Sequence, residues 1–299
     1  METSMNDPSE TPKMTSQKNG VTDNPWQLLR EFTAARISLG RSGVSIPTSE
    51  MLAFQLAHAQ ARDAVHTPLN FDELQQQLGE LTTQFPKLMS SKAITLHSQA
   101  IDRTVYLQRP DLGRSLESKS VKKLQKAASQ YTYNLAIVVA DGLSATAIYQ
   151  NALPFIQLLL EALQQDEQPW TLAPITLVEQ GRVAISDEVG ELLNADLVLM
   201  LIGERPGLSS PDSMGLYLTW APRVGLNDSS RNCISNVRPQ GLIYSAAVQK
   251  SMYLLRESRR LKLSGVNLKD RSTAIGQDKT TGDTIEHEQH SSPTHFLSE

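Results

Sequence analysis

The stretch NLAIVVADG, residues 134–142, contains the strongest indication of the fold. Its first seven residues are apolar apart from Asn134 and rich in β-branched side chains, and the run ends at Asp141-Gly142. Short apolar runs of this kind are typical of strands that are buried on both faces, as in parallel sheets. We therefore predict a central strand over residues 134–140.

Strands and helices alternate downstream of this strand. Ser144 can cap a helix, and we expect Pro154 to kink or restart that helix because proline removes a backbone hydrogen bond. A second strand is predicted over 175–178 and a third over 197–202, with a short helix from Ser186 between them. Alternation of strand, helix and strand at this spacing indicates a parallel sheet with right-handed crossovers. The sequence thus predicts an α/β fold with a Rossmann-like, mostly parallel sheet.

The pattern continues toward the C-terminal end. A further strand is predicted over 216–221, and a last helix over 241–261, for which Gly265 provides a stop signal. We assign residues 111–270 to the Rossmann-like domain.

The preceding region, residues 24–110, has a helical pattern. Pro25 stands at the start of a predicted helix, where its missing N–H costs nothing, and apolar residues at helical spacing follow over 27–37. A second helix is predicted over 48–65, with Thr48 as its N-cap. We therefore expect a helical N-terminal region ahead of the sheet.

Both ends of the chain are polar and acidic. Residues 1–23 have a net charge of −2 and residues 271–299 a net charge of −3, and neither shows an apolar period. We predict a disordered N-terminal tail and a disordered acidic C-terminal tail. His287 and His290 stand in the sequence HEQH, which is one residue short of the zinc motif H-E-x-x-H, so we predict no metal site there.

Composition excludes several classes of protein. Of the 299 residues 39% are hydrophobic and 20% charged, as in ordinary globular proteins. Because the tails hold the excess acid, the body is close to neutral and gives no case for nucleic acid or an anionic membrane. A single cysteine, Cys233, excludes an internal disulfide and suggests a reducing compartment. No run of 18 apolar residues and no signal-peptide pattern occur, so a cytoplasmic location is expected.

The carboxyl ends of the predicted strands indicate where a ligand would bind. In open parallel sheets ligands lie outside these ends, here at residues 141–142, 181–183 and 203–207. The last segment reads GERPG, in which the glycines allow a ligand to approach the backbone closely. It matches neither G-x-G-x-x-G nor a Walker loop, which argues against a nucleotide phosphate. Spacing alone supports a ligand edge and a simple strand-ending turn equally.

No self-sufficient active site can be recognised in the sequence. Cys233 has no histidine partner nearby, so a small buried or ligand-touching residue is a better interpretation than a nucleophile. We predict no catalytic residue and no metal ligand in this chain.

Several motifs taken together resemble one known family, the light (small) chain of ethanolamine ammonia-lyase. The resemblance covers roughly residues 24–270, and its motifs occur in the family's order and spacing. They are ARISLGRSG at 35–43, YLQRPDLGR at 106–114, DGLS at 141–144, GRV at 181–183, GERPGL at 203–208 and CISN at 233–236.

The resemblance implies a function that the residues alone do not give. Members of this family belong to an adenosylcobalamin-dependent lyase that converts ethanolamine to acetaldehyde and ammonia by radical chemistry, which the cofactor supplies. The large (heavy) chain holds the substrate, and the light chain closes over the cobalamin. By motif match the cobalamin contacts are Val183, Glu204 and Cys233, and the 24–110 region contacts the large chain.

Two absences bear on this interpretation. The D-x-H-x-x-G motif, whose histidine ligates cobalt, does not occur, so base-on binding of the cofactor is expected. Residues 1–23 lack the amphipathic helix that packages some relatives into bacterial microcompartments, so a free cytosolic enzyme is expected. The alternatives are a non-catalytic Rossmann-like binding or assembly protein and a standalone nucleotide enzyme; the missing phosphate loop argues against the latter.

Overall fold

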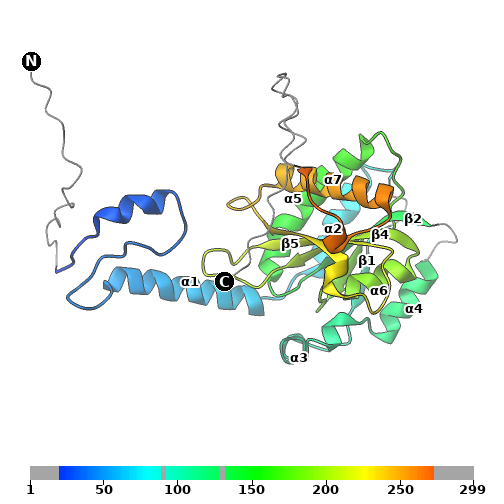
Figure 1. Ribbon diagram of the computed structural model, residues 1–299. Helices are drawn as coiled ribbons and strands as arrows, with labels where there is room; N and C mark the ends of the chain where they lie inside the picture. Colours follow the sequence, from blue (N-terminus) through cyan, green and yellow to red (C-terminus); the bar gives the residue numbers. More distant parts are fainter. Residues whose placement is uncertain (1–19, 89–91, 128–131, 273–299) are drawn as a thin grey trace, which may run out of the picture.

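The computed structural model describes residues 20–88, 92–127 and 132–272 (Figure 1). Its centre is a six-stranded sheet in the order β1-β3-β2-β4-β5-β6. The two predicted disordered tails lie almost entirely outside the described residues. The strands are β1 (Ile94–His97), β2 (Tyr133–Ala140), β3 (Thr176–Glu179), β4 (Ala195–Gly203), β5 (Met214–Trp220) and β6 (Arg231–Val237).

The four strands from β1 to β4 are parallel, which confirms the predicted α/β fold with a mostly parallel sheet. β2 is central, and its residues from Leu135 to Ala140 are all buried. Strands covered on both faces need apolar residues at consecutive positions, as the sequence shows. β5 and β6 are antiparallel to their neighbours and complete one edge.

Helices cover both faces of the sheet. One face of β2 presents Leu135, Ile137 and Val139 to a core that also includes buried residues of three helices. The opposite face presents Ala136 and Val138 to a second core, with residues of two further helices. The first group comprises α2 (Phe71–Thr82), α5 (Ala145–Gln164) and α7 (Tyr244–Leu261), and the second α4 (Ser118–Ala127) and α6 (Ile185–Leu192).

α5 begins as predicted, because Ser144 Oγ accepts a hydrogen bond of 3.2 Å from the N–H of Ala147. The helix does not restart at Pro154, which lies inside it. α7 ends at Leu261, and Lys262 at its C-cap has a left-handed φ of 55°. Gly265 therefore lies beyond the cap, where it opens the 3-10 helix η4 (Gly265–Asn267).

The sequence pattern missed two strands, one at each edge of the sheet. β1 lies within the stretch expected to be helical, and it has only four residues. β6 contains polar residues and is exposed at several positions, so it lacks the apolar run of a central strand. Edge strands are short and partly solvated, and for that reason their sequences carry a weak pattern.

Residues 20–66 form an N-terminal arm that extends away from the body of the molecule (Figure 1). It contains the 3-10 helix η1 (Pro25–Glu31), where a longer helix was expected, and α1 (Thr48–His66). The N-cap of α1 is Pro47 and not Thr48, and no side chain caps the helix. α1 buries only Ala57 and Ala64. Large apolar side chains of the arm are exposed: Trp26, Leu28, Leu29, Phe32, Ile37, Val44, Ile46, Met51, Leu52, Phe54 and Leu56.

Two short elements lie between β1 and α4. They are α3 (Arg103–Gln108) and the 3-10 helix η2 (Leu112–Arg114). Asp102 caps α3, because its carboxylate accepts a hydrogen bond of 2.8 Å from the N–H of Val105.

Candidate functional site

The carboxyl ends of β2 and β3 are joined by a buried carboxylate. Asp141 Oδ1 accepts hydrogen bonds from the N–H of Gly142 at 2.9 Å and of Gly181 at 3.2 Å. Burial raises the pKa of Asp141 to about 6, although the nearby Arg103 guanidinium, 3.5 Å away, acts in the opposite direction. At the predicted ligand edge, this carboxylate therefore connects the turn after β2 to the turn after β3.

The turns after β2 and β4 touch so closely that both need glycine. Gly142 has a φ of +58°, and a Cβ there would lie 2.3 Å from the carbonyl oxygen of Gly203. A Cβ on Gly203 would lie 2.0 Å from the carbonyl oxygen of Ser144. Only glycine allows this approach of backbone to backbone. The contact fixes the direction in which the chain leaves β4 at Glu204.

Glu204 extends from the end of β4 to β6. Its Oε1 accepts a hydrogen bond of 2.6 Å from Ser235 Oγ, and its Oε2 accepts from the N–H of Asn236 at 3.2 Å and from Ser213 Oγ. The path crosses β5 above Gly215, where an added Cβ would lie 2.9 Å from Glu204 Oε1. The missing side chain of Gly215 thus leaves room for the carboxylate, which remains half-buried.

Cys233 lies on β6 directly opposite Tyr217 of β5. The side chain is exposed, yet the surrounding protein desolvates the thiol and raises its pKa. A hydrogen bond with Tyr217 opposes this effect, and the negative charge of Glu204 adds to it. Because the thiolate is disfavoured, the group is suited to apolar contact and not to nucleophilic attack.

Val183 belongs to the turn after β3, two strands away from β4 in the sheet. It is half-buried against the core on the α6 side, the same core against which Tyr217 packs. Val183 also lines a cavity of about 540 Å³ together with Arg114, Arg182 and Asp228. The structure thus places Glu204 and Cys233 around Tyr217, with Cys233 level with the middle of β4, whereas Val183 lies in the turn after β3.

Asp187, which also lines this cavity, belongs to a buried ion pair. Arg231 of β6 pairs with Asp187 of α6, and both side chains are only 2% exposed. Arg231 also contacts Asp228, which is exposed. Burial raises the pKa of Asp187, although Arg231 opposes the shift. No local sequence pattern indicates this pair, because its two members are 44 residues apart.

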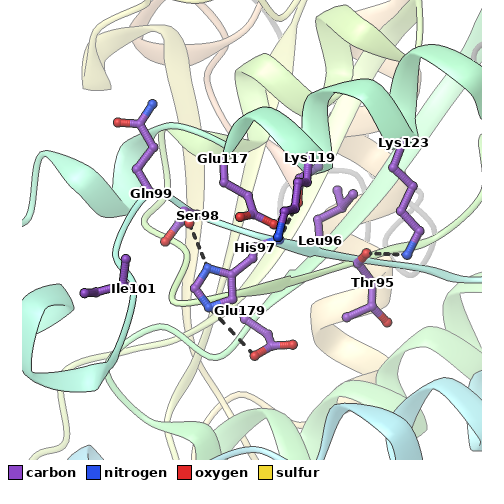
Figure 2. Close-up of a pocket in the computed structure, with 11 residues that line it drawn as sticks. Thr95, Leu96, His97, Ser98, Gln99, Ile101, Glu117, Lys119, Lys123 and Glu179 are labelled. Carbon is purple, nitrogen blue, oxygen red and sulfur yellow. Dashed lines mark hydrogen bonds and ion pairs between the residues drawn. The ribbon is translucent and has the colours of Figure 1, made fainter.

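A second cavity, of about 590 Å³, lies beside β1, the outermost strand on the side of the sheet away from β6 (Figure 2). His97 Nδ1 is 2.7 Å from the carbonyl oxygen of Ser98 and acts as a donor there, which leaves Nε2 facing Glu179 Oε2 at 4.0 Å. Lys123 Nζ donates to the carbonyl oxygen of Thr95 at 2.9 Å. Two lysines, Lys119 and Lys123, and two glutamates line the cavity, so its positive and negative charges nearly cancel.

The described residues contain neither a metal-binding cluster nor a membrane-spanning helix. Within residues 20–88, 92–127 and 132–272, no group of three or more His, Cys, Asp or Glu side chains could hold a metal ion. In the same part of the chain, no helix has the length and apolar character needed to cross a membrane.

The known proteins that are similar to this chain carry the same description. The sequence model of the family described as ethanolamine ammonia-lyase light chain (EutC) matches residues 23–269. The chain is 55% identical over 265 residues to an ethanolamine ammonia-lyase small subunit of Azotobacter vinelandii, covering 88% of this chain and 94% of that protein. It is 56% identical over 252 residues to a protein with the same description from Ralstonia nicotianae, covering 84% and 90%.

Proposed function

The chain belongs to the ethanolamine ammonia-lyase light chain family, and from this premise we propose that it holds one side of adenosylcobalamin against a large catalytic chain. The complex is a carbon–nitrogen lyase, and its proposed reaction converts ethanolamine to acetaldehyde and ammonia. Bound cobalamin would supply the radical chemistry, and the residues of this chain would bind and orient it. The observation that carries the proposal is the position of Glu204 at the ligand edge.

The carboxylate of Glu204 has acceptor capacity to spare. An ionised carboxylate has about four lone-pair sites. Three are occupied by Ser213, Ser235 and the N–H of Asn236. The remaining site, on Oε1, can accept an amide N–H from the rim of a corrin ring. The three internal bonds hold the carboxylate in place, so little conformational entropy is lost when a ligand binds.

The other two proposed contacts suit the flat face of a corrin. Cys233 presents a neutral thiol, which behaves as a small apolar group. Val183 presents a half-buried aliphatic side chain in the turn after β3. Neither side chain can ligate cobalt as an imidazole does, in keeping with base-on binding of the cofactor.

We assign the contact with the large chain to the N-terminal arm. Most of its large apolar side chains are exposed, among them Phe32 at 84% and Val44 at 106%. Many large apolar side chains exposed on one segment indicate an interaction site. A groove of about 550 Å³ between η1 and α1 is lined by apolar residues and by the Arg30–Glu50 pair, whose atoms lie 2.8 Å apart.

Reconstitution tests the proposal directly. The chain is mixed with an ethanolamine ammonia-lyase large chain, then with adenosylcobalamin and ethanolamine, and acetaldehyde is measured over time. We expect turnover that needs both chains, and cobalamin that stays with the complex in gel filtration. A complex that neither turns over nor retains cobalamin would contradict the proposal and favour a non-catalytic binding or assembly role. The cytoplasmic location stays a prediction. Co-sedimentation of the native protein with microcompartment shell proteins would contradict it.

A further inference from the structure

Arg103 connects the N-terminal arm to the ligand edge. Its Nε donates a hydrogen bond of 2.7 Å to the carbonyl oxygen of Val65, in the last turn of α1. Its Nη1 donates to the carbonyl oxygen of Gly142 at 2.7 Å and to Gln180 Oε1 at 3.3 Å. One side chain therefore joins the end of α1 to the turns after β2 and β3.

The guanidinium of Arg103 is held firmly in this position. Its Cζ lies 4.8 Å from the centre of the Tyr106 ring, and Arg182 lies on the same ring at 4.2 Å. The hydroxyl of Tyr106 donates to the carbonyl oxygen of Gly181 at 3.0 Å. The Arg103 side chain is 18% exposed and Asp141, with which it pairs, 5% exposed. The planar fork of arginine can donate in two directions at once, whereas the single ammonium of lysine cannot reproduce both bonds.

Arg36 makes a second connection of the same kind. Its guanidinium donates to the carbonyl oxygen of Leu208 at 3.1 Å and to Ser209 Oγ at 3.3 Å. Ser209 Oγ in turn donates to the carbonyl oxygen of Ala34 at 3.3 Å. Leu208 and Ser209 belong to the loop that follows Glu204. The arm is thus connected through Arg103 to the turns after β2 and β3, and by its own hydrogen bonds to the loop after β4.

Apolar packing contributes little to the attachment of α1, since only Ala57 and Ala64 of this helix are buried. We propose that Arg103 is a positioning residue, which couples docking of the large chain on the arm to cofactor binding at the carboxyl edge. This inference rests on the proposed function. It assigns to the arm a second role besides contact with the large chain, because the arm sets the positions of the turns that meet the corrin. Coupling of this kind is reciprocal, so cofactor and large chain each tighten the binding of the other.

The test is a comparison of binding constants. The affinity of the full chain for the large chain is measured with and without adenosylcobalamin, for wild type, R103A, R103K and the control R260A. Arg260 is an exposed arginine of α7, and among the described residues its guanidinium bonds to Glu257 of the same helix. In wild type and R260A we expect the cofactor to tighten association by about fivefold or more. In R103A the tightening factor should fall by about threefold or more, with R103K in between.

A merely structural role gives a different result. If R103A weakens binding of the large chain equally with and without the cofactor, so that the tightening factor keeps its wild-type value, the coupling role is wrong. It is also wrong if the cofactor does not tighten association in wild type. Amide hydrogen exchange of the isolated chain provides a readout that does not depend on the cofactor. R103A should raise exchange in the last turn of α1 but leave β4 protected, and unchanged exchange in α1 would contradict the inference. If wild type binds no cobalamin, the proposed function itself has failed.

Discussion

Glu204 at the end of β4 and Ser235 on β6 are joined by a hydrogen bond of 2.6 Å that passes over the strand between them. The bond is possible because Gly215, on the intervening β5, has no side chain. The carboxylate is thereby held at the carboxyl end of β4 instead of extending into solvent. Its remaining acceptor site is the one that we propose for the cofactor.

Replacement of Glu204 tests that role. Glu204→Ala removes the acceptor and should weaken cobalamin binding to the complex by about 1–3 kcal/mol, the usual cost of an unpaired buried polar group. Glu204→Gln should have a smaller effect, because the amide keeps one acceptor oxygen. Equilibrium dialysis with adenosylcobalamin measures the affinity, and Glu80→Ala, at an exposed position of α2, serves as the control. Equal affinities for all variants would remove Glu204 from the site.

Chemical modification tests the position of Cys233, the single cysteine of the chain. Since the pKa of its thiol is raised, iodoacetamide should react with it more slowly at pH 7 than with free cysteine. In the two-chain complex, adenosylcobalamin should slow the reaction further by covering the thiol. Mass spectrometry of the peptide around Cys233 gives the rate. A rate that is the same with and without the cofactor would place the corrin elsewhere.

The titration of Asp141 should appear in the pH dependence of stability. Its pKa is about 6 in the folded chain, whereas an exposed aspartate titrates near 3.9. Between these values the folded state binds more protons than the unfolded state, so the free energy of unfolding should decrease as pH rises from about 4 to about 6. The full effect is about 3 kcal/mol. Urea unfolding at several pH values should show this decline in wild type and not in Asp141→Asn; parallel curves would contradict the assignment.

The ion pair between Asp187 and Arg231 should contribute strongly to stability. Asp187→Ala leaves the buried guanidinium with the exposed carboxylate of Asp228 and the neutral carbonyl oxygen of Leu226 as its partners, and arginine cannot lose its proton. We expect a loss of about 3–5 kcal/mol in the free energy of unfolding, measured with urea. The double variant Asp187→Ala/Arg231→Met should lose less than the single one, because no charge is left unpaired. A larger loss in the double variant would show that packing, not charge, dominates.

The N-terminal arm can be tested without the cofactor. Phe32→Ser and Val44→Ser each remove an exposed apolar side chain, so the stability of the isolated chain should stay the same. If these side chains are buried against the large chain, association should weaken by about 1.5–3 kcal/mol for each. Val266→Ser, 70% exposed on η4, is the matched control. Calorimetric titration gives the affinities, and unaltered values for the arm variants would exclude this surface from the interface.

The sequence identifies the central strands and one loop of the site because both depend on local patterns. β2 and β4 are buried on both faces, so their residues must be apolar at consecutive positions. The turn glycines that follow them, Gly142 and Gly203, stand where only glycine allows the backbones to touch. Position at a carboxyl end then makes Glu204 a candidate contact before any relative is considered.

Only the tertiary structure determines what surrounds Glu204. Its partner Ser235 lies on an edge strand whose sequence has no clear pattern, and the two are 31 residues apart. Arg103 contacts turns that follow it by 39 and 77 residues, through donors that any surface arginine also has. Burial of a strand restricts the identity of each residue in turn, and so it is visible in the sequence. The pairing of one polar group with another depends on strand order and register, which no local pattern specifies.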